Sequence, residues 1–465
     1  MLFSSPVFLL FFAAYFFVHL VTPPKGRILL IIVGSTVFYA WWKASYVWLP
    51  YLLMAIAYGG ILWIESCKRP EGQRRRLAIT IILLFLPLVF FKYTDFVYGD
   101  ILGPIFGLKG PILNLPLPLG VSFITFTLTA YVVDISRGRY PRIPSLSTST
   151  GYLLFFPHLI AGPILRPVEL VPQLEHQRPA LHARFYIGLL IFTVGLVKKL
   201  VFADTISGFV DPIYSADAAP SAAQALLAIY GFSAQIYCDF SGYTDMAIGL
   251  ALLIGIRLPN NFLRPYISVS PVDFWRRWHI TLSFWLRDYL YIPLGGSRKG
   301  RIRTYVNLFI TMVLGGLWHG ASWTFVIWGA LHGVGLAFVH FMRGVFGRGR
   351  PLEMPRMIAI FLTFHFVTLL WVFFRAPTLS KAFQILSAPF VGNWSGAVAY
   401  ASANLSVLIL LAIFAALHIF DDHRHIYVVA RRLRPAVVLP LVLVLWAVAM
   451  TLSQGASTKF IYFEF

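Results

Sequence analysis

The sequence is poor in charge and nearly free of cysteine, and each shortage argues against a class of protein. Charged residues make up 12% of the chain and hydrophobic residues 58%, whereas an average soluble domain is about 25% charged. This composition excludes a water-soluble protein. The two cysteines, Cys67 and Cys238, lie far apart in the sequence, so no disulfide framework is expected. Cys238 is predicted to be a small buried hydrophobe.

Several catalytic and ligand-binding motifs are missing as well. The sequence has no G-x-S-x-G nucleophile elbow and no P-loop, so ATP-driven transport has no support. None of the 12 histidines forms an i, i+4 pair with carboxylates at ligand spacing. We therefore expect neither a metal site nor a bound cofactor.

Long apolar runs recur along the whole chain, several of them about 17 to 22 residues long, which is the length that crosses a bilayer as a helix. The fold class predicted from them is an all-α polytopic membrane protein. The expected spans are 6–22, 28–42, 46–64, 77–93, 116–134, 185–203, 221–238, 240–256, 304–318, 322–342, 357–375, 404–420 and 436–453. The run 150–165 is interrupted by Pro157 and by Gly162-Pro163, which predicts a re-entrant segment.

The net charge of +20 gathers in short loops between the apolar runs, which favours contact with anionic lipid over nucleic acid. Lysine and arginine number five in 65–76, three in 137–142, nine in 257–303, four in 343–356 and four in 423–434. The positive-inside rule places all five loops in the cytoplasm. Counting spans outward from them places both chain termini on the outer, periplasmic side.

The segment 257–303 is basic and aromatic but too polar to span a membrane. Four large apolar side chains recur within it at helical spacing: Phe274, Trp278, Leu282 and Trp285. This pattern predicts one in-plane amphipathic helix, with Asp273 as its N-cap and Pro293 and Gly295 at its end.

His319 stands at the end of an apolar run, in "LGGLWHGASW". In a soluble core a lone histidine is usually structural, but inside a membrane an ionisable residue is first a functional hypothesis. Glycines 315, 316 and 320 allow a close backbone approach or a break in the helix. A buried neutral imidazole there could act as a general base on a hydroxyl group.

His279, in "FWRRWHITL", has two readings of equal weight: an interfacial histidine beside lipid headgroups, or a wall of a cytoplasmic pocket. In the second reading nearby cations attract phosphate groups. The hypothetical donor-binding set is Arg276, Arg277, Trp278, Arg298 and Lys299. Asp239 and Asp245 lie in apolar sequence, and we expect them to pair with arginines of 257–303, the alternative being a polar channel lining.

Several long blocks of the sequence resemble one known family. They include "LPLPLGVSFITFT" (115–127), "FFPHLIAGPILRPVELVPQL" (155–174), "QIYCDFSGYTDMAIGLA" (235–251), "DFWRRWHITLSFWLRDYLYIPLGG" (273–296) and "LGGLWHGASWTFVIWGALHG" (314–333). The chain is similar to membrane-bound O-acyltransferases (MBOAT), in the bacterial branch that acetylates alginate and related polymers.

The resemblance implies a ring of tilted helices around a central tunnel, with re-entrant and in-plane helices. It implies a single integral-membrane domain over 1–465, with N-terminal helices in 1–110, a core in 111–375 and C-terminal helices in 376–465. His319 matches the family's invariant histidine and His279 its donor-side histidine.

The implied activity is O-acetyl transfer from cytoplasmic acetyl-CoA across the inner membrane to an alginate-like exopolysaccharide or cellulose, with periplasmic acetyltransferase-type partner proteins. O-acetylation of peptidoglycan stays an alternative, as does the nature of the direct acceptor, a partner protein or the glycan itself. Polar groups near the membrane midplane are also typical of transporters, so a second possibility is a transporter or flippase that moves a glycan or acylated intermediate without chemistry. A scaffold that only anchors periplasmic enzymes is the third possibility.

Overall fold

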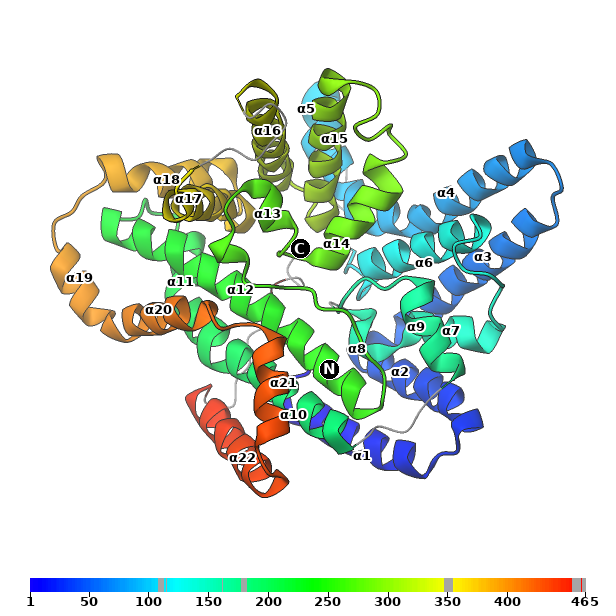
Figure 1. The fold of residues 1–465 in the computed structure, drawn as a ribbon. Coiled ribbons are helices and arrows are strands. Elements are labelled where there is room, and N and C mark those ends of the chain that lie inside the picture. The colour runs from blue at the N-terminus through cyan, green and yellow to red at the C-terminus, as the bar shows by residue number, and fades with distance from the viewer. Residues whose placement is uncertain are drawn as a thin grey trace. The chain divides into compact units, whose positions relative to one another are not determined.

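The computed structural model describes residues 1–107, 113, 115–160, 162–176, 182–346, 354–453 and 461, and the described residues form helices without a strand. The chain divides into two compact units. The first comprises Met1–Phe192 and Met246–Pro259, and the second comprises Thr193–Asp245 and Asn260–Phe465. Figure 1 shows the helices in chain order from blue to red.

Within its described residues the first unit contains nine α-helices, the beginning of a tenth and the end of α12 (Ala222–Leu253). The first ten are α1 (Pro6–Val21), α2 (Arg27–Lys43), α3 (Trp48–Glu65), α4 (Pro70–Asp95), α5 (Gly103–Phe106), α6 (Val121–Ser136), α7 (Leu146–Leu154), α8 (Phe156–Leu159), α9 (Pro167–Glu175) and α10 (His182–Val197). Every residue of α6 from Val121 to Ile135 is buried. A helix that is apolar all round belongs in an interior, and α6 packs against α3 and α4.

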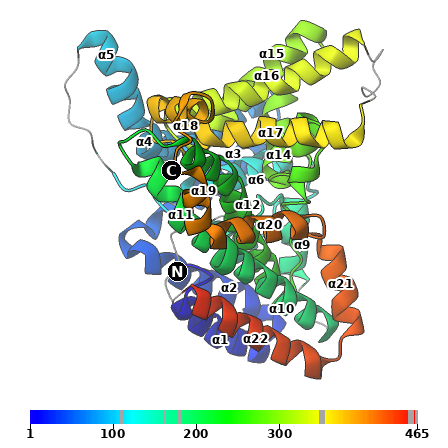
Figure 2. The same ribbon diagram turned by 90° about the vertical axis from the view of Figure 1, so that its left-hand side faces the viewer.

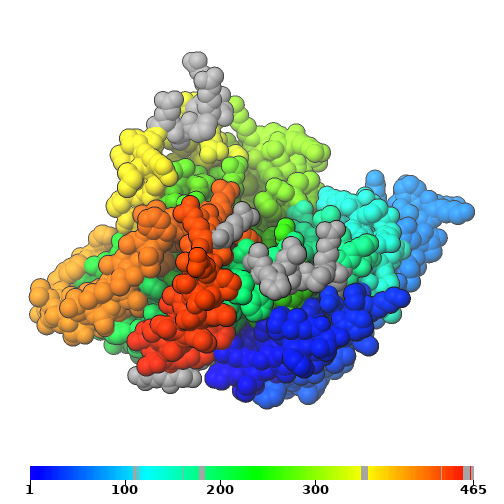
Figure 3. All heavy atoms as spheres, turned by 60° about the horizontal axis from the view of Figure 1, so that its bottom comes forward, coloured from blue at the N-terminus to red at the C-terminus, as the bar shows by residue number. Residues whose placement is uncertain are grey.

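The second unit holds the remaining helices, with most of α12 among them. They are α11 (Asp204–Ser215), α12 (Ala222–Leu253), α13 (Pro271–Trp275), α14 (Ile280–Trp285), α15 (Arg301–His319), α16 (Trp323–Val345), α17 (Arg356–Arg375), α18 (Leu379–Val391), α19 (Ala397–Ala403), α20 (Leu405–His418), α21 (His423–Arg432) and α22 (Pro435–Leu452). Helices α15, α16 and α17 lie side by side (Figure 2). Helices α20 to α22 gather on the face shown in orange and red in Figure 3.

Glycines set the closest helix contacts of the second unit. A Cβ atom on Gly316 would lie 2.3 Å from the backbone oxygen of Phe325, and one on Gly329 would lie 2.3 Å from that of Met312. Helices α15 and α16 therefore touch backbone to backbone, as small residues allow in membrane proteins. Gly320 ends α15 in an extended conformation. Both uses of glycine expected near His319 are confirmed.

Seven described helices are long and apolar enough to cross a membrane: 24–46, 48–65, 70–106, 184–215, 323–345, 356–375 and 435–452. The bent pair 397–403 and 405–418 could make an eighth span, and α1 and α6 are shorter apolar helices. A multi-pass helical membrane protein is thus confirmed. The division between 221–238 and 240–256 was wrong, because α12 runs unbroken through Asp239.

The run 150–165 is broken, as its prolines and glycine predict. Its residues form α7 and α8, which are separated at Phe155, and are followed by an irregular segment. The hydroxyl of Tyr152 donates to the backbone oxygen of Leu165 at 2.7 Å, and the Nε2 atom of His158 bonds the backbone oxygen of Tyr152 at 2.9 Å. Internal side-chain bonds therefore satisfy backbone carbonyls that the broken helix leaves open. Its re-entrant path stays a prediction.

The single amphipathic helix predicted in 257–303 was wrong. Helix α13 ends at Trp275, α14 begins at Ile280, and His279 between them has a φ of 41°. Left-handed backbone at a non-glycine residue ends helical geometry. Ser270 is the N-cap of α13, with its side chain accepting from the backbone N–H of Asp273, so Asp273 is not the cap. The four predicted apolar side chains are nevertheless all buried.

Candidate active site

His319 is the last residue of α15, at the turn that leads into α16. Ser322 caps α16 by accepting a hydrogen bond from the backbone N–H of Thr324 at 3.3 Å. The His319 side chain is buried, and aromatic rings surround it. Their centroids lie at 4.9 Å for Trp318, 5.1 Å for Trp328 and 5.2 Å for Phe374. The sequence thus places an imidazole in a compact aromatic enclosure rather than on the surface.

Two other buried histidines join His319 in one row of ring contacts, which we call the histidine row: His279, Trp318, His319, Trp328 and His332. The Trp318 ring lies 6.2 Å from that of His279, and the Trp328 ring lies 4.8 Å from that of His332. The structure therefore brings both predicted catalytic histidines into contact with one indole ring, that of Trp318. Their catalytic roles stay predictions.

His279 is fully buried and held by Asn261. Its Nδ1 atom lies 3.2 Å from the side-chain oxygen of Asn261, and its ring packs edge-to-face on Phe240 with a centroid distance of 4.8 Å. Burial lowers the pKa of His279 to about 3, because a charged imidazolium loses its hydration in an apolar interior. The imidazole is therefore neutral at physiological pH. Full burial argues against an interfacial His279 beside lipid headgroups, and its place in the wall of a cytoplasmic pocket stays a prediction.

His332 was missed by the sequence analysis. It is fully buried on α16, and its Nδ1 atom accepts a hydrogen bond from Nε1 of Trp275 at 3.2 Å. The sequence feature that could have identified it is a histidine in the apolar segment "GALHG", thirteen residues after His319. No local sequence pattern relates it to Trp275. Asn261 was also missed, because an asparagine in a loop carries no periodic signal.

The expected donor-binding residues do not share one environment. Arg276, Arg298 and Lys299 are exposed, as a phosphate-binding role requires. Arg277 forms an ion pair with Asp273 at 2.9 Å. Trp278 is instead buried at 1% exposure and packs on Trp371 with a ring distance of 4.8 Å, so it supports the interior rather than facing solvent.

The carboxylates of α12 do pair, but the arginine partners predicted for them were wrong. Lys199 bonds Asp204 at 2.8 Å and Asp239 at 2.6 Å, and Lys198 bonds Asp245 at 2.8 Å. The lysines lie within a π-helical turn, Lys198–Ala203. A π turn re-aims successive side chains, which explains how two adjacent lysines meet different carboxylates.

The carboxyl-terminal part of the chain completes this set of ion pairs. Lys198 also bonds Asp421 at 2.7 Å, and Asp421 accepts from the hydroxyl of Tyr237 at 2.5 Å. The Nε2 atom of His423 lies 2.8 Å from Asp245. We call this group the lysine cluster: Lys198, Lys199, Asp204, Asp239, Asp245 and Asp421.

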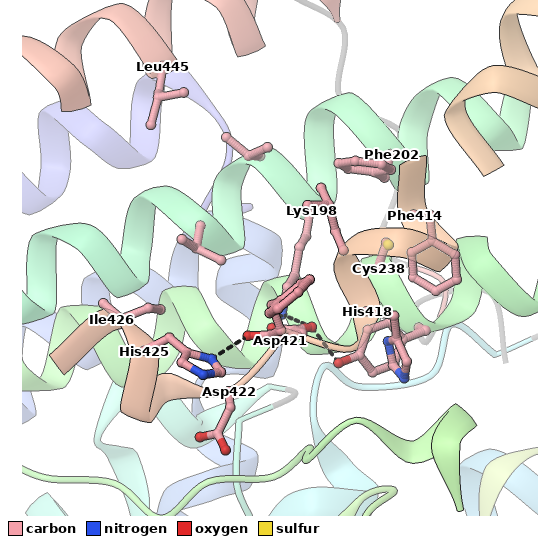
Figure 4. Close-up of a pocket in the computed structure, with 15 residues that line it drawn as sticks. Lys198, Phe202, Cys238, Phe414, His418, Asp421, Asp422, His425, Ile426 and Leu445 are labelled. Atoms are coloured by element: carbon pink, nitrogen blue, oxygen red, sulfur yellow. Dashed lines mark hydrogen bonds and ion pairs between the residues drawn. The ribbon is translucent and has the colours of Figure 1, made fainter. Parts of the chain in front are cut away.

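A cavity of about 330 Å³ borders the lysine cluster, and Figure 4 shows its lining. Apolar side chains such as Phe202, Phe414 and Leu445 form most of its wall, with Cys238 among them. Cys238 is buried, as predicted. Within the described part of the chain, no three His, Cys, Asp or Glu side chains are grouped so that they could hold a metal ion.

These features define a class: a multi-pass helical membrane protein with buried histidines enclosed by aromatic rings. The model of the membrane-bound O-acyltransferase (MBOAT) family matches residues 136–377 of the sequence. That range contains the whole histidine row. The chain belongs to this family and is an acyltransferase.

Three curated relatives indicate the range of activities nearby. A probable alginate O-acetylase AlgI of Azotobacter vinelandii is 40% identical over 401 residues, covering 85% of this chain and 79% of that protein. The peptidoglycan O-acetyltransferase of Helicobacter pylori is 37% identical over 420 residues, covering 83% and 79%. The teichoic acid D-alanyltransferase of Bacillus subtilis is 30% identical over 269 residues, covering 55% and 68%. The names of all three describe acyl transfer, and each names a polymer.

Proposed function

We propose that the protein is an O-acetyltransferase of the bacterial inner membrane, which takes acetyl groups from cytoplasmic acetyl-CoA and passes them outward to a polysaccharide. The observation that carries this proposal is the enclosure of His319 by aromatic rings at the end of α15. Two of the relatives described above are named as O-acetylating enzymes, one for alginate and one for peptidoglycan. An alginate-like exopolysaccharide or cellulose is the acceptor polymer we favour.

The position of His319 along α15 suits transfer across the membrane. The helix begins at Arg301 in the basic segment and ends at His319, so the two residues are separated by 18 steps of 1.5 Å, about 27 Å. The hydrocarbon core of a bilayer is about 30 Å thick. With the basic segment in the cytoplasm, an acetyl group that reaches His319 has travelled most of the way to the outer side.

In the proposed reaction His319 is the general base. The acceptor hydroxyl oxygen attacks the carbonyl carbon of the acetyl thioester while a neutral imidazole nitrogen of His319 accepts the hydroxyl proton. A carbon–oxygen bond forms, the carbon–sulfur bond breaks, and the proton passes to the departing CoA thiolate. The surrounding aromatic rings exclude water, which keeps the imidazole neutral before reaction and limits hydrolysis of the thioester.

The cytoplasmic side of the site is proposed to hold the donor. The exposed cations Arg276, Arg298 and Lys299 attract the phosphates of acetyl-CoA, and Arg277 can join them from its ion pair with Asp273. His279 belongs to the same basic segment, and its ring contacts Trp318, which in turn contacts His319. We propose that it contacts the thioester end of the donor. Trp278 is assigned a packing role.

The direct acceptor is proposed to be a hydroxyl group of a periplasmic acetyltransferase-type partner or of the glycan itself. Both chain termini are placed on the periplasmic side by the positive-inside rule. Neither the attack of the hydroxyl group on the thioester nor the release of CoA requires a metal or a cofactor beyond the donor substrate.

Release of CoA tests this function most simply. Purified protein in lipid nanodiscs receives acetyl-CoA and a soluble oligosaccharide acceptor, and free thiol and acetylated product are measured together. We expect both to form in equal amounts. A transporter or a scaffold would release no CoA, whether the oligosaccharide is offered alone or together with a periplasmic acetyltransferase-type partner, and that result would overturn the proposal.

A further inference from the structure

The loop between α12 and α13 carries a side chain that contacts His279 directly. Asn261 is buried at 1% exposure, and its side-chain oxygen accepts from the backbone N–H of Thr281 at 3.1 Å and from the Thr281 hydroxyl at 2.9 Å. The same oxygen lies 3.2 Å from Nδ1 of His279. Three donors therefore converge on one amide oxygen.

This arrangement fixes which nitrogen of His279 carries the proton. A backbone N–H can only donate, so the Asn261 atom that it meets is the oxygen and not the amide nitrogen. An oxygen of this kind can only accept, so the Nδ1 atom of His279 must be the donor. A neutral imidazole has a single N–H. Its Nε2 atom therefore bears a lone pair and can accept a proton or a hydrogen bond.

The backbone around Asn261 reinforces this geometry. The Asn261 carbonyl accepts from the backbone N–H of Ile280, and the Arg277 carbonyl accepts from that of Leu263, both at 2.9 Å. Among the described residues only Arg264 and His279 are non-glycine residues with positive φ. Both flank this short pairing of loop segments. Left-handed backbone persists where the surroundings over-determine it, and such positions cluster at functional sites.

We propose that Asn261 is a positioning residue for acyl transfer, which holds His279 as the Nδ1–H tautomer so that Nε2 is presented as the accepting nitrogen. This inference rests on the proposed function for the role of His279, but the tautomer itself does not depend on that function. Asn261 touches no substrate in this account. It acts through His279, in the way that an outer carboxylate or carbonyl oxygen orients a metal-bound histidine in other proteins.

Three variants separate this role from simple packing. Asn261→Ala should lower kcat by about 10-fold to 100-fold, the loss typical when the partner of a working histidine is removed, with the KM for acetyl-CoA within about twofold of the wild type. Thr281→Val is the matched control, because it removes a donor from the same oxygen but leaves the His279 bond. It should keep kcat within about threefold of the wild type.

The third variant, Asn261→Asp, retains the acceptor oxygen and adds a negative charge. It should restore kcat relative to the alanine variant. The carboxylate favours the imidazolium form, so it raises the pKa of His279 above the low value that burial gives. If activity needs a neutral imidazole, acidification should abolish the activity of Asn261→Asp at a higher pH than that of the wild type. The acid limb of the pH–rate profile should therefore move upward.

The tautomer can be read without any activity by ¹⁵N NMR of histidine-labelled protein in nanodiscs, with the His279 signals assigned from their absence in His279→Gln. We expect a protonated Nδ1 and an unprotonated Nε2 in the wild type and a changed pattern in Asn261→Ala. The opposite tautomer in the wild type, an unchanged kcat in folded Asn261→Ala, or equal losses in Asn261→Ala and Thr281→Val would overturn the proposal. A wild-type protein that shows the expected tautomer but transfers no acetyl group would contradict the proposed function and leave the Asn261 assignment standing.

Discussion

The second unit buries polar side chains in two different ways. In the histidine row the polar groups are buried imidazoles separated by tryptophan rings. In the lysine cluster they are full charges, each cation bonded to two carboxylates within 2.8 Å. The two groups meet on consecutive residues of α12, since Asp239 bonds Lys199 and Phe240 packs on His279.

The difference separates a site that can react from one that only holds the fold. A buried ion pair whose partners are saturated has no protonation change to offer, and breaking it is costly because a charge is left without compensation. A neutral imidazole in an apolar enclosure can accept a proton during a reaction. It carries no ion pair, so its replacement breaks few contacts that stabilise the fold. We therefore expect substitutions in the histidine row to lower activity without unfolding, and substitutions in the lysine cluster to do the reverse.

The largest effect is expected from His319→Gln, which removes the general base but keeps a polar side chain of similar size. The transfer rate should fall by about 10²-fold to 10⁴-fold, while acetyl-CoA binding and the melting temperature stay near the wild-type values. Radiometric transfer assays and thermal unfolding in detergent measure the two quantities. His365→Gln is the control, because His365 bonds the Phe361 carbonyl of its own helix. Transfer at a near wild-type rate in His319→Gln would remove His319 from the chemistry.

The reverse pattern is expected from Lys199→Met in the lysine cluster. The change removes the cation that bonds both buried carboxylates, Asp204 and Asp239, and breaking a buried ion pair costs about 3–5 kcal/mol. The folded fraction should fall sharply, while the protein that remains folded keeps its specific activity. Arg142→Gln is the comparison, because the Arg142 side chain, which pairs with Glu175, is 61% exposed and pairs near the surface contribute little to stability. Equal melting temperatures for the two variants would contradict the structural role of the cluster.

A smaller effect on binding alone is expected from the double variant Arg276→Gln, Arg277→Gln. Phosphate contacts are made equally in the ground state and the transition state, so their loss raises KM and leaves kcat nearly unchanged. We expect the KM for acetyl-CoA to rise about tenfold, the loss of roughly one charge-assisted hydrogen bond. Steady-state kinetics with varied acetyl-CoA provides the test. A collapse of kcat at constant KM would place these arginines in the chemical step or in the fold.

The last prediction concerns the orientation of the chain in the membrane. In a Cys67→Ser background, single cysteines replace the exposed residues Lys299 and Ser395. The positive-inside rule places the first in the cytoplasm and the second outside. An impermeant thiol reagent applied to intact cells should modify the cysteine at 395 and spare the one at 299. Labelling at 299 would put the donor-binding cations on the wrong side of the membrane for cytoplasmic acetyl-CoA.

The sequence predicted the helices far better than it predicted which buried side chains bond to one another. Apolar runs identify helices such as α16 and α17 because burial in lipid or protein is decided residue by residue along the chain. The choice of Lys199 as partner for Asp239 depends on a π turn forty residues away in the sequence, and no local pattern encodes it. The break at His279 was hidden for a related reason. Helical spacing continues through it, but hydrogen bonds to the Asn261 loop hold the backbone in a left-handed turn.

His319 itself could be found from the sequence, since an imidazole between glycines at the end of an apolar run is conspicuous. Its enclosure could not, because Phe374 comes from α17, more than fifty residues later in the chain. The same holds for His332, whose bond to Trp275 joins α16 to α13. Residue types in the sequence indicate that a site exists, but only the fold shows which aromatic rings enclose it.

The most direct test of the account is the fate of labelled acetyl groups on His319 when no acceptor is present. Purified wild-type protein is incubated with [¹⁴C]acetyl-CoA alone, denatured, freed of unbound donor and analysed for label by peptide mass spectrometry. A general base forms no bond to the acetyl group, so we predict that no label remains on His319 and that transfer begins only when a hydroxyl acceptor is added. Stoichiometric acetylation of His319 that is discharged by the acceptor would contradict the account and show covalent catalysis instead.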